Sequence, residues 1–189
     1  MCTSENRHRT PDQILGPYFP VGRGAFTGAD LIGMEAGDGQ AQGEMIEVTG
    51  RIINLDGEPV RGARLTIWQA NSFGRYRHPN DRNVAPLDPN FVGCTRIRSN
   101  EDGSYVIKTV KPGAYPAGPD WMRPPHIHFE VRGRFERLVT QMYFPDEPLN
   151  ERDRLLAAAL RPELLVAAEA KLQKTPRRIL NFDIVLLRG

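Results

Sequence analysis

The sequence predicts a mostly β protein, with an antiparallel β-sandwich core, an irregular N-terminal arm and a late helical segment. Three observations support this fold class. Short segments with strand-like alternation recur from residue 45 onward, and turn-forming pairs such as Asp56 and Gly57 separate them. Helical character is confined to one stretch near the end of the chain. We therefore expect an arm over residues 1–44 and one sandwich domain over residues 45–189.

The elements follow in order along the chain. Residues 94–99 and 104–110 are expected to form a hairpin, because the turn-forming segment NEDG lies between them. A loop is expected over residues 112–125, which are rich in Gly and Pro. A helix is expected over residues 147–173, with a break at Pro162, since proline lacks the backbone N–H. The complete set of expected strands comprises residues 45–55, 63–70, 94–99, 104–110, 126–132, 137–144 and 178–187.

Length and composition are those of an ordinary soluble domain. The chain has 189 residues and a formal net charge of +2, without a dense run of Lys and Arg, so no nucleic-acid partner is expected. Cys2 and Cys94 lie far apart and form neither a disulfide framework nor a CxxC motif. The polar N-terminus lacks the apolar stretch of a signal peptide, and no segment is long enough to span a membrane. A cytoplasmic location without membrane contact is therefore expected.

Two of the four histidines, His126 and His128, stand one residue apart in an expected strand. Side chains alternate along a strand, so both imidazoles project to one face and could bind one cation. The alternative is a pair of ordinary surface histidines. A cupin-type metal site would also use this spacing, and Glu130 would share the face, but the later histidine that such a site needs is absent. The other histidines of the chain are His8 and His78.

Tyrosines are the strongest candidates for the remaining ligands. Tyr76 and Tyr115 lie in loops punctuated by Gly and Pro, where functional residues concentrate, whereas Tyr105 and Tyr143 lie in strands and are expected to pack. Two phenolates and two imidazoles would favour a hard trivalent metal, above all Fe(III). Such an ion is also acidic enough to deprotonate phenols, whose ordinary pKa is about 10. Zn(II) would more usually be held by Cys or by a third His.

The chain resembles the intradiol ring-cleavage dioxygenases, most of all the protocatechuate type, over about residues 45–150. The resemblance rests on five segments that occur in the order found in that family: VTGRIINLDGEPVRGARLTIWQANSFGRYRHPND, APLDPNFVG, EDGSYVIKTVKPGAYP, RPPHIHFEV and RLVTQMYF. It implies a β-sandwich enzyme that uses non-haem Fe(III) and O2 to cleave a catecholic ring to a cis,cis-muconate-type product, without an added reductant. A non-catalytic transthyretin-like binding sandwich is the alternative class, and it gives no reason for all four candidate ligands to be present.

The resemblance also implies roles for individual residues. Tyr76, Tyr115, His126 and His128 match the Fe(III) ligands of the family. Tyr115 would in addition leave the iron when substrate binds and take up a substrate proton. The implied substrate is protocatechuate or a related substituted catechol, and the alternatives are hydroxyquinol, pyrogallol or another catechol.

Three further residues match positions that surround the iron in that family. Arg123 would stabilise the carbanion-like charge on the ring carbon that O2 attacks. Gln141 and Trp68 match residues that line the site, and Trp68 is equally well explained as a core aromatic. The chain departs from the family pattern at Ala117, where a tryptophan is usual, and the segment from Tyr115 to Arg123 is shorter. Both departures leave the identity of the catechol open.

The arm contains TPDQILGPYFP, which resembles the start of the partner chain in the protocatechuate type. In that chain a Gly-Pro-Tyr segment helps to build the substrate pocket of a neighbouring iron-bearing subunit. The resemblance therefore implies that Gly16, Pro17 and Tyr18 bind substrate, with Tyr18 as the candidate for a substrate carboxylate, and that the arm packs on another subunit. A homo-oligomer is expected, with a hetero-oligomer as the alternative. Only 44 residues precede the first expected strand, which favours the protocatechuate type over types with a large N-terminal helical domain.

Overall fold

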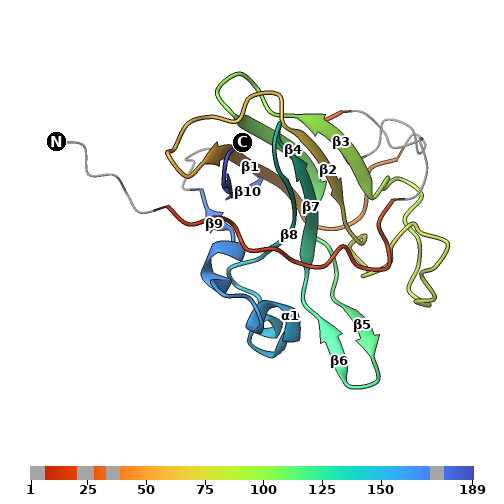
Figure 1. The fold of residues 1–189 in the computed structure, drawn as a ribbon. Helices are drawn as coiled ribbons and strands as arrows, with labels where there is room; N and C mark the ends of the chain where they lie inside the picture. The colour runs from red at the N-terminus through yellow and green to blue at the C-terminus, as the bar shows by residue number, and fades with distance from the viewer. Residues whose placement is uncertain (1–6, 21–27, 33–38, 171–176) are drawn as a thin grey trace.

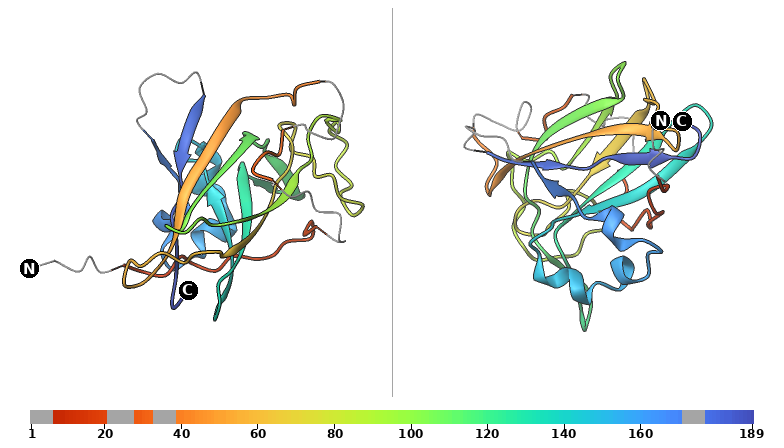
Figure 2. Two further views of the ribbon diagram at one scale, coloured as in Figure 1. Left: turned by 90° about the horizontal axis from the view of Figure 1, so that it is seen from above. Right: turned by 90° about the vertical axis from the view of Figure 1, so that its left-hand side faces the viewer.

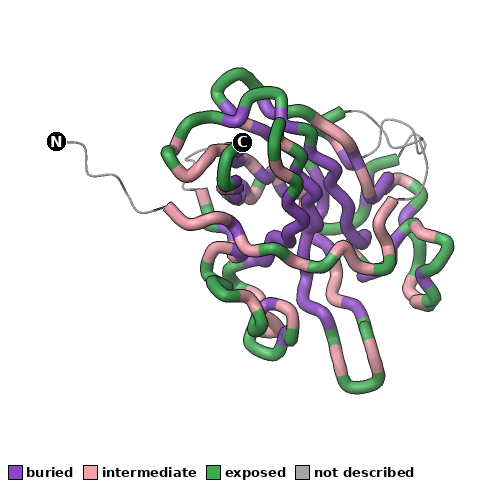
Figure 3. The backbone as a smooth tube through the Cα atoms, viewed as in Figure 1, coloured by how far each residue is buried: buried purple, intermediate pink, exposed green. Residues whose placement is uncertain are grey.

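The structure is a computed structural model of the chain, and it describes residues 7–20, 28–32, 39–170 and 177–189. Two β-sheets pack face to face, and a two-stranded ribbon extends from one end (Figure 1, Figure 2). The largest hydrophobic cluster lies between the sheets. Buried residues run along the centre of the molecule, and exposed residues gather at the periphery (Figure 3). The predicted mostly β sandwich is therefore confirmed.

The first sheet is built around β1 (Met45–Asn54). On one side β4 (Ser104–Val110) pairs with β1 in antiparallel orientation. On the other side β10 (Arg178–Asn181) and β11 (Ile184–Leu186) pair with β1 in parallel, one after the other along its length. The short β9 (Ala168–Glu169) pairs antiparallel with β10. The C-terminal strands thus make this sheet mixed, which the sequence did not predict.

The second sheet contains β3 (Cys94–Arg98), β2 (Arg64–Trp68), β7 (His126–Arg132) and β8 (Arg137–Tyr143), in that order and all antiparallel. Because side chains alternate along each strand, one face of this sheet is apolar and packs against the first sheet. That inner face contributes Leu65, Ile67, Ile127, Phe129 and Val131 to the core. The outer face carries the polar residues of the same strands, and the candidate site is there.

The remaining elements are short. The ribbon is formed by β5 (Tyr115–Gly118) and β6 (Trp121–Arg123), inside a segment expected to be only loop. After β8 the chain forms a 3₁₀ turn, η1 (Pro148–Arg152), one turn of α-helix, α1 (Arg154–Ala157), and a second 3₁₀ turn, η2 (Pro162–Leu165). Among the described residues, no helix has the length and apolar character needed to cross a membrane.

The predicted hairpin of residues 94–99 and 104–110 is wrong, although both segments are strands. β3 pairs with β2 in one sheet, and β4 pairs with β1 in the other. The expected tight turn exists, since Gly103 donates its N–H to Asn100 O at 3.0 Å, but Gly103 O also accepts from Ile52 N of β1 at 2.9 Å. The turn is therefore a corner between the two sheets, and turn chemistry alone does not distinguish a corner from a hairpin.

The helix predicted over residues 147–173 is also wrong in extent. The segment forms η1, α1, η2 and β9, and residues 171–173 lie outside the described residues. Asp153 starts a new turn by accepting the N–H groups of the residues that follow it, and Pro162 starts another. The leucines that suggested one long helix are instead buried from separate short turns. They form a small cluster with a residue of β8: Tyr143, Leu156 and Leu165.

The last predicted strand, residues 178–187, is divided into β10 and β11 at Phe182 and Asp183. The carboxylate of Asp183 accepts the backbone N–H of Arg51 at 2.8 Å, which occupies a ladder position on β1. The division of the chain at residue 45 into an arm and a domain stays a prediction.

Gly50 lies where β1, β4 and the bend between β10 and β11 meet. A Cβ atom at Gly50 would lie 2.0 Å from the carbonyl oxygen of Phe182 and 2.9 Å from Cε1 of Tyr105. The same carbonyl accepts the Tyr105 hydroxyl at 2.6 Å, so neither neighbour is free to move away. This contact requires glycine for steric reasons.

We expect Gly50→Ala to lower the free energy of unfolding by about 1–3 kcal/mol, because the added methyl group would push the Phe182 backbone and the Tyr105 ring away from β1. Denaturant titration of the purified protein would measure this. The matched control is Gly118→Ala, since a Cβ atom at Gly118 meets no atom within 4 Å. Equal midpoints for the two variants would contradict the close approach at Gly50.

Candidate active site

The candidate site lies on the outer face of the second sheet, at the end where β7 begins. Strand register places Trp68 of β2 and Gln141 of β8 on either side of His128, and places Tyr143 opposite His126. Directly opposite residues in an antiparallel pair project to the same face of the sheet. The five side chains therefore form one continuous patch, although they come from three strands.

The two histidines are oriented so that their Nε2 atoms face each other. Nδ1 of His126 lies 2.7 Å from the carbonyl oxygen of Pro124, so this ring donates through Nδ1 and presents a lone pair at Nε2. The Nε2 atoms of His126 and His128 are 3.2 Å apart, close to the separation of two imidazoles that each bind one ion at about 2.1 Å. Trp68 stacks on His128 with ring centroids 4.7 Å apart. No described residue bonds Nδ1 of His128, so this stacking orients the ring.

Tyr76 and Tyr115 reach the same point from two other segments. The Tyr76 hydroxyl lies 3.5 Å from Nε2 of His126. The ring centroids of Tyr76 and Tyr115 are 5.4 Å apart in an edge-on arrangement, and that of Tyr115 is 5.6 Å from that of His126. All four side chains, including His128, are buried. The structure therefore brings the four predicted ligands together.

The loops that carry the two tyrosines are joined through Asn71. Its side-chain oxygen accepts the N–H groups of Phe73 and Arg75, both at 3.0 Å, and its backbone carbonyl accepts that of Gly113 at 2.9 Å. Gly74 has a φ of +80°, and a Cβ there would lie 2.2 Å from a backbone oxygen of the Tyr115 loop. The two tyrosine loops therefore form one rigid unit.

Burial determines the protonation of the four groups. It lowers the pKa of His126 to about 3 and that of His128 well below its usual value, so both imidazoles are neutral donors. It raises the pKa of Tyr76 well above its usual value and raises that of Tyr115, so only a strongly polarising cation would ionise these phenols.

Two imidazoles and two phenols fit a hard trivalent cation such as Fe(III). Within the described residues, no three His, Cys, Asp or Glu side chains gather that could hold a metal ion instead. The tyrosines are therefore the donors available to complete a site around the two histidines.

Arg123 lies beside this set and is held in place by three hydrogen bonds. It faces Tyr115 across the β5–β6 ribbon. Its Nε donates to Asp153 at 2.7 Å, and its Nη2 donates to the side-chain oxygen of Gln141 at 2.7 Å and to the Tyr143 hydroxyl at 3.0 Å. The Arg123 and Asp153 side chains are 3% and 0% exposed, so the pair is buried.

Asp153 and Tyr143 were not predicted as site residues. Tyr143 was expected only to pack, but its hydroxyl lies 3.2 Å from Asp153, besides its contact with Arg123. A signal for Tyr143 existed, since it lies two residues after Gln141 and shares its face of the strand. Asp153 had no such signal, because its place beside Arg123 depends on the path of the chain after β8.

The N-terminal arm covers the site of its own chain. Gly16 has a φ of +73°, and a Cβ there would lie 3.4 Å from Cε1 of His128. The ring of Tyr18 lies 4.5 Å from that of Tyr76, between centroids, and Pro17 is exposed at the turn between Gly16 and Tyr18. Of the predicted substrate-binding residues, Gly16, Tyr18 and Trp68 thus surround the four candidate ligands.

In the structure the described segment of the arm lies on its own chain, and the expectation that the arm also packs on another subunit stays a prediction. The described arm crosses the second sheet past β8 and β7 (Figure 1), and the N–H of Gln13 donates to Val139 O of β8 at 2.7 Å. The side chain of Gln141 donates to the carbonyl of Ile14 at 3.2 Å. The sequence did not predict that the arm lies on its own chain. The exposed edge of β8 can pair with an extended segment of the same chain or of another chain, and local sequence does not determine which of the two it is.

Known proteins resemble this chain both in sequence and in fold. The sequence pattern of the family described as Dioxygenase matches residues 14–188. The protocatechuate 3,4-dioxygenase beta chain of Burkholderia cepacia is 49% identical over 145 residues, which cover 73% of this chain and 62% of that one. Hydroxyquinol 1,2-dioxygenase of Rhizobium sp. (strain MTP-10005) is 35% identical, over 78% of this chain and 54% of that protein. The chain thus spans less than two thirds of the length of both relatives.

Solved structures agree on the fold. The dioxygenase domain of a dioxygenase–carbohydrate-binding protein fusion from Streptomyces sp. SirexAA-E superposes with a TM-score of 0.74 at 28% identity, covering 96% of this chain and all of that one. A point mutant of catechol 1,2-dioxygenase from Acinetobacter radioresistens superposes with a TM-score of 0.75 at 22% identity, over 97% of this chain and 64% of that one.

Replacing Asp153 with alanine should be strongly destabilising, because it leaves Arg123 buried without its carboxylate partner. The expected loss in free energy of unfolding is about 3–5 kcal/mol. Glu101→Ala is the control, because Glu101 is 90% exposed and pairs with Arg61 at 3.5 Å; a change below about 1 kcal/mol is expected there. Chemical denaturation would compare them, and similar losses for both variants would contradict the buried pair.

Proposed function

The chain belongs to the intradiol ring-cleavage dioxygenases, and on that premise we propose that it binds Fe(III) and cleaves a catecholic ring between its two hydroxylated carbons. One molecule of O2 per ring balances the reaction, and both of its oxygen atoms appear in a cis,cis-muconate-type dicarboxylate. The observation that carries this proposal is the convergence of two buried imidazoles and two buried phenols, with Nε2 atoms 3.2 Å apart.

The proposed ligands are Tyr76, Tyr115, His126 and His128. A ferric ion would withdraw electron density from a bound catecholate, which makes the ring reactive towards O2 without an external reductant. The protein keeps the two imidazoles neutral and shields the four groups from water through burial. Tyr115 is the proposed acceptor of a catechol proton, because a ferric ion would hold it as a phenolate, and a phenolate can take up that proton. Arg123 lies opposite Tyr115 across the ribbon, and its positive charge favours this anionic form by opposing the rise of the Tyr115 pKa.

Arg123 is proposed to stabilise the negative charge that develops on the ring. Its guanidinium is held by Asp153, Gln141 and Tyr143, so it needs no reorganisation when charge appears. Gln141 is proposed to act with it, because one end of its amide accepts from Arg123 and the other donates to the arm at Ile14. The arm and the arginine are thereby linked through a single side chain.

Protocatechuate or a related substituted catechol is the proposed substrate. The similarity to a protocatechuate 3,4-dioxygenase beta chain supports this choice, and the similarity to a hydroxyquinol 1,2-dioxygenase supports hydroxyquinol as the alternative. Gly16, Pro17, Tyr18 and Trp68 are the proposed pocket residues, with the Tyr18 hydroxyl as donor to a substrate carboxylate. Ala117 is exposed in β5, so the tryptophan usual in the family at this position would have extended one wall of the substrate pocket.

An oligomer is proposed because the similar protocatechuate 3,4-dioxygenase protein is named as a beta chain, which is one chain of an assembly.

The direct test is to purify the protein with iron and record its visible spectrum and its O2 uptake. A broad tyrosinate-to-iron band together with O2-dependent, reductant-free loss of a catechol supports the proposal. A screen of protocatechuate, catechol, hydroxyquinol and pyrogallol would identify the substrate. Protein that binds iron without the band and consumes none of these catechols would refute the proposal.

Tyr76→Phe should lower iron affinity by about 10- to 100-fold and weaken the visible band, because it removes one anionic ligand atom. Tyr105→Phe is the matched control: it removes the hydroxyl that donates to Phe182 O in the core, so stability falls while iron and the band are retained. Metal analysis and the visible spectrum would be read for both. Full iron and an unchanged band in Tyr76→Phe would remove this residue from the ligand set.

Arg123→Ala should lower kcat by about 100- to 1000-fold, because a preorganised charge is lost. Arg123→Lys should recover part of this loss, since an ammonium keeps the charge but lacks the planar fork that reaches Asp153 and Gln141 together. Turnover would be normalised to bound iron and folded fraction, because the alanine variant also unpairs Asp153. Normal kcat per iron in Arg123→Ala would show that the arginine is structural only.

A further inference from the structure

The end of the second sheet remote from the metal site carries an unusual row of like charges. Register places Arg98 of β3, Arg64 of β2, Arg132 of β7 and Arg137 of β8 side by side across all four strands. Like charges directly opposite one another on a sheet are destabilising. A fourfold row of this kind therefore costs stability unless an anion lies against it.

The charges on this face are only partly neutralised. Glu130, in the next row, accepts from Arg132 at 2.9 Å and from Arg137 at 2.7 Å. Arg96 of β3 lies opposite Thr66 of β2. Among the described residues, neither Arg64 nor Arg96 forms an ion pair or a side-chain hydrogen bond. Five arginines and one glutamate leave four positive charges here, whereas the whole chain carries a net charge of +2.

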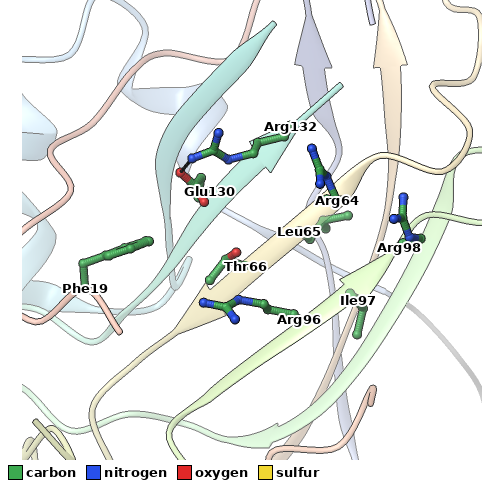
Figure 4. A pocket seen from close by; sticks show the side chains of 9 residues that line it. All are labelled: Phe19, Arg64, Leu65, Thr66, Arg96, Ile97, Arg98, Glu130 and Arg132. Carbon is green, nitrogen blue, oxygen red and sulfur yellow. Dashed lines mark hydrogen bonds and ion pairs between the residues drawn. The ribbon is translucent and has the colours of Figure 1, made fainter. Parts of the chain in front are cut away.

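Four of these five arginines, together with Glu130, border a pocket of about 660 Å³ (Figure 4). Arg64, Arg96, Arg98 and Arg132 line one part of it, and Figure 4 shows Phe19 of the arm at the opposite end. The pocket therefore offers several guanidinium groups together with an aromatic wall. A compact organic anion with a hydrocarbon body and more than one anionic group matches both features.

We propose that this arginine pocket binds an organic dicarboxylate. Guanidinium forks pair with carboxylates through two parallel hydrogen bonds, so arginines on neighbouring strands can hold two carboxylates of one molecule. The choice of carboxylate rests on the proposed function, because opening a ring between two hydroxylated carbons creates two carboxylates. The chemical class of ligand is therefore that of the proposed product, bound at a second site.

The pocket and the metal site share a wall. Phe19 lines the pocket and packs edge-on against Trp68, with centroids 5.1 Å apart, and Trp68 stacks on His128. Both sites therefore lie on the outer face of one sheet, and the pocket binds its anion beside the metal site rather than within it.

Calorimetric titration of the iron-loaded full chain tests this at low ionic strength. Adipate and hexanoate are the probes, because they have the same chain length and differ in carrying two carboxylates or one. Adipate should bind at least about tenfold more tightly than hexanoate, and binding should weaken with added salt. The double variant Arg64→Gln/Arg96→Gln should lose tenfold or more in adipate affinity.

The matched control is Arg61→Gln/Arg161→Gln, which removes the same charge from two exposed arginines outside the pocket and should bind adipate like the parent. Arg64→Gln alone should raise Tm by about 1–4 °C without ligand, because it relieves repulsion in the row; a merely structural arginine would lower Tm. Adipate binding that is equal in the two double variants, or equal for adipate and hexanoate, would overturn the inference. A colourless, inactive protein would count against the proposed function and leave the calorimetric comparison interpretable.

Discussion

The register of β7 between β2 and β8 is the constraint on which the rest of the structure depends. Because side chains alternate, Ile127, Phe129 and Val131 enter the core while His126 and His128 face outward. A shift of one residue would place both imidazoles between the sheets and expose the apolar residues, so the hydrophobic core enforces the position of the histidines. The same register brings the flanking side chains from β2 and β8 to the histidine pair.

The outer face then requires a cover, since an imidazole pair open to water would not have neutral, desolvated nitrogens. The arm provides it, with Tyr18 on Tyr76 and Phe19 on Trp68. Polar groups beneath the cover are satisfied by one another: Arg123 by Asp153, Gln141 and Tyr143. Such a network is stabilising only when complete, because each buried group left unpaired carries a desolvation cost. Arm, ribbon and α1 are therefore held in place by the same few side chains.

The outer face of this sheet changes character along its length. Aromatic and imidazole rings occupy the end where β7 begins, and arginines occupy the end where β7 terminates, with Thr66 and Glu130 between them. The proposed metal site is desolvated and nearly uncharged in the absence of a cation, and the arginine row is solvated and strongly positive. Four arginines side by side repel one another, and this repulsion lowers the stability of the sheet. An anion bound against the row would offset that repulsion.

The sequence by itself determined the long strands of the two large sheets, because alternation is local to each segment, and it determined that His126 and His128 share a face, whereas the short strands β5, β6 and β9 were not predicted. Tyr76 and Tyr115 were candidates because of their loops, Arg123 and Gln141 were found through resemblance to a family, and the structure brings all four to one place. Only the tertiary structure decided which strands pair, that the turn after β3 is a corner, that Asp153 and Tyr143 hold Arg123, that the arm covers its own chain's site, and that arginines form a row. These are contacts between residues far apart in the chain. A segment's own periodicity specifies which side chains share a face, but its partner and register depend on the packing of the whole core.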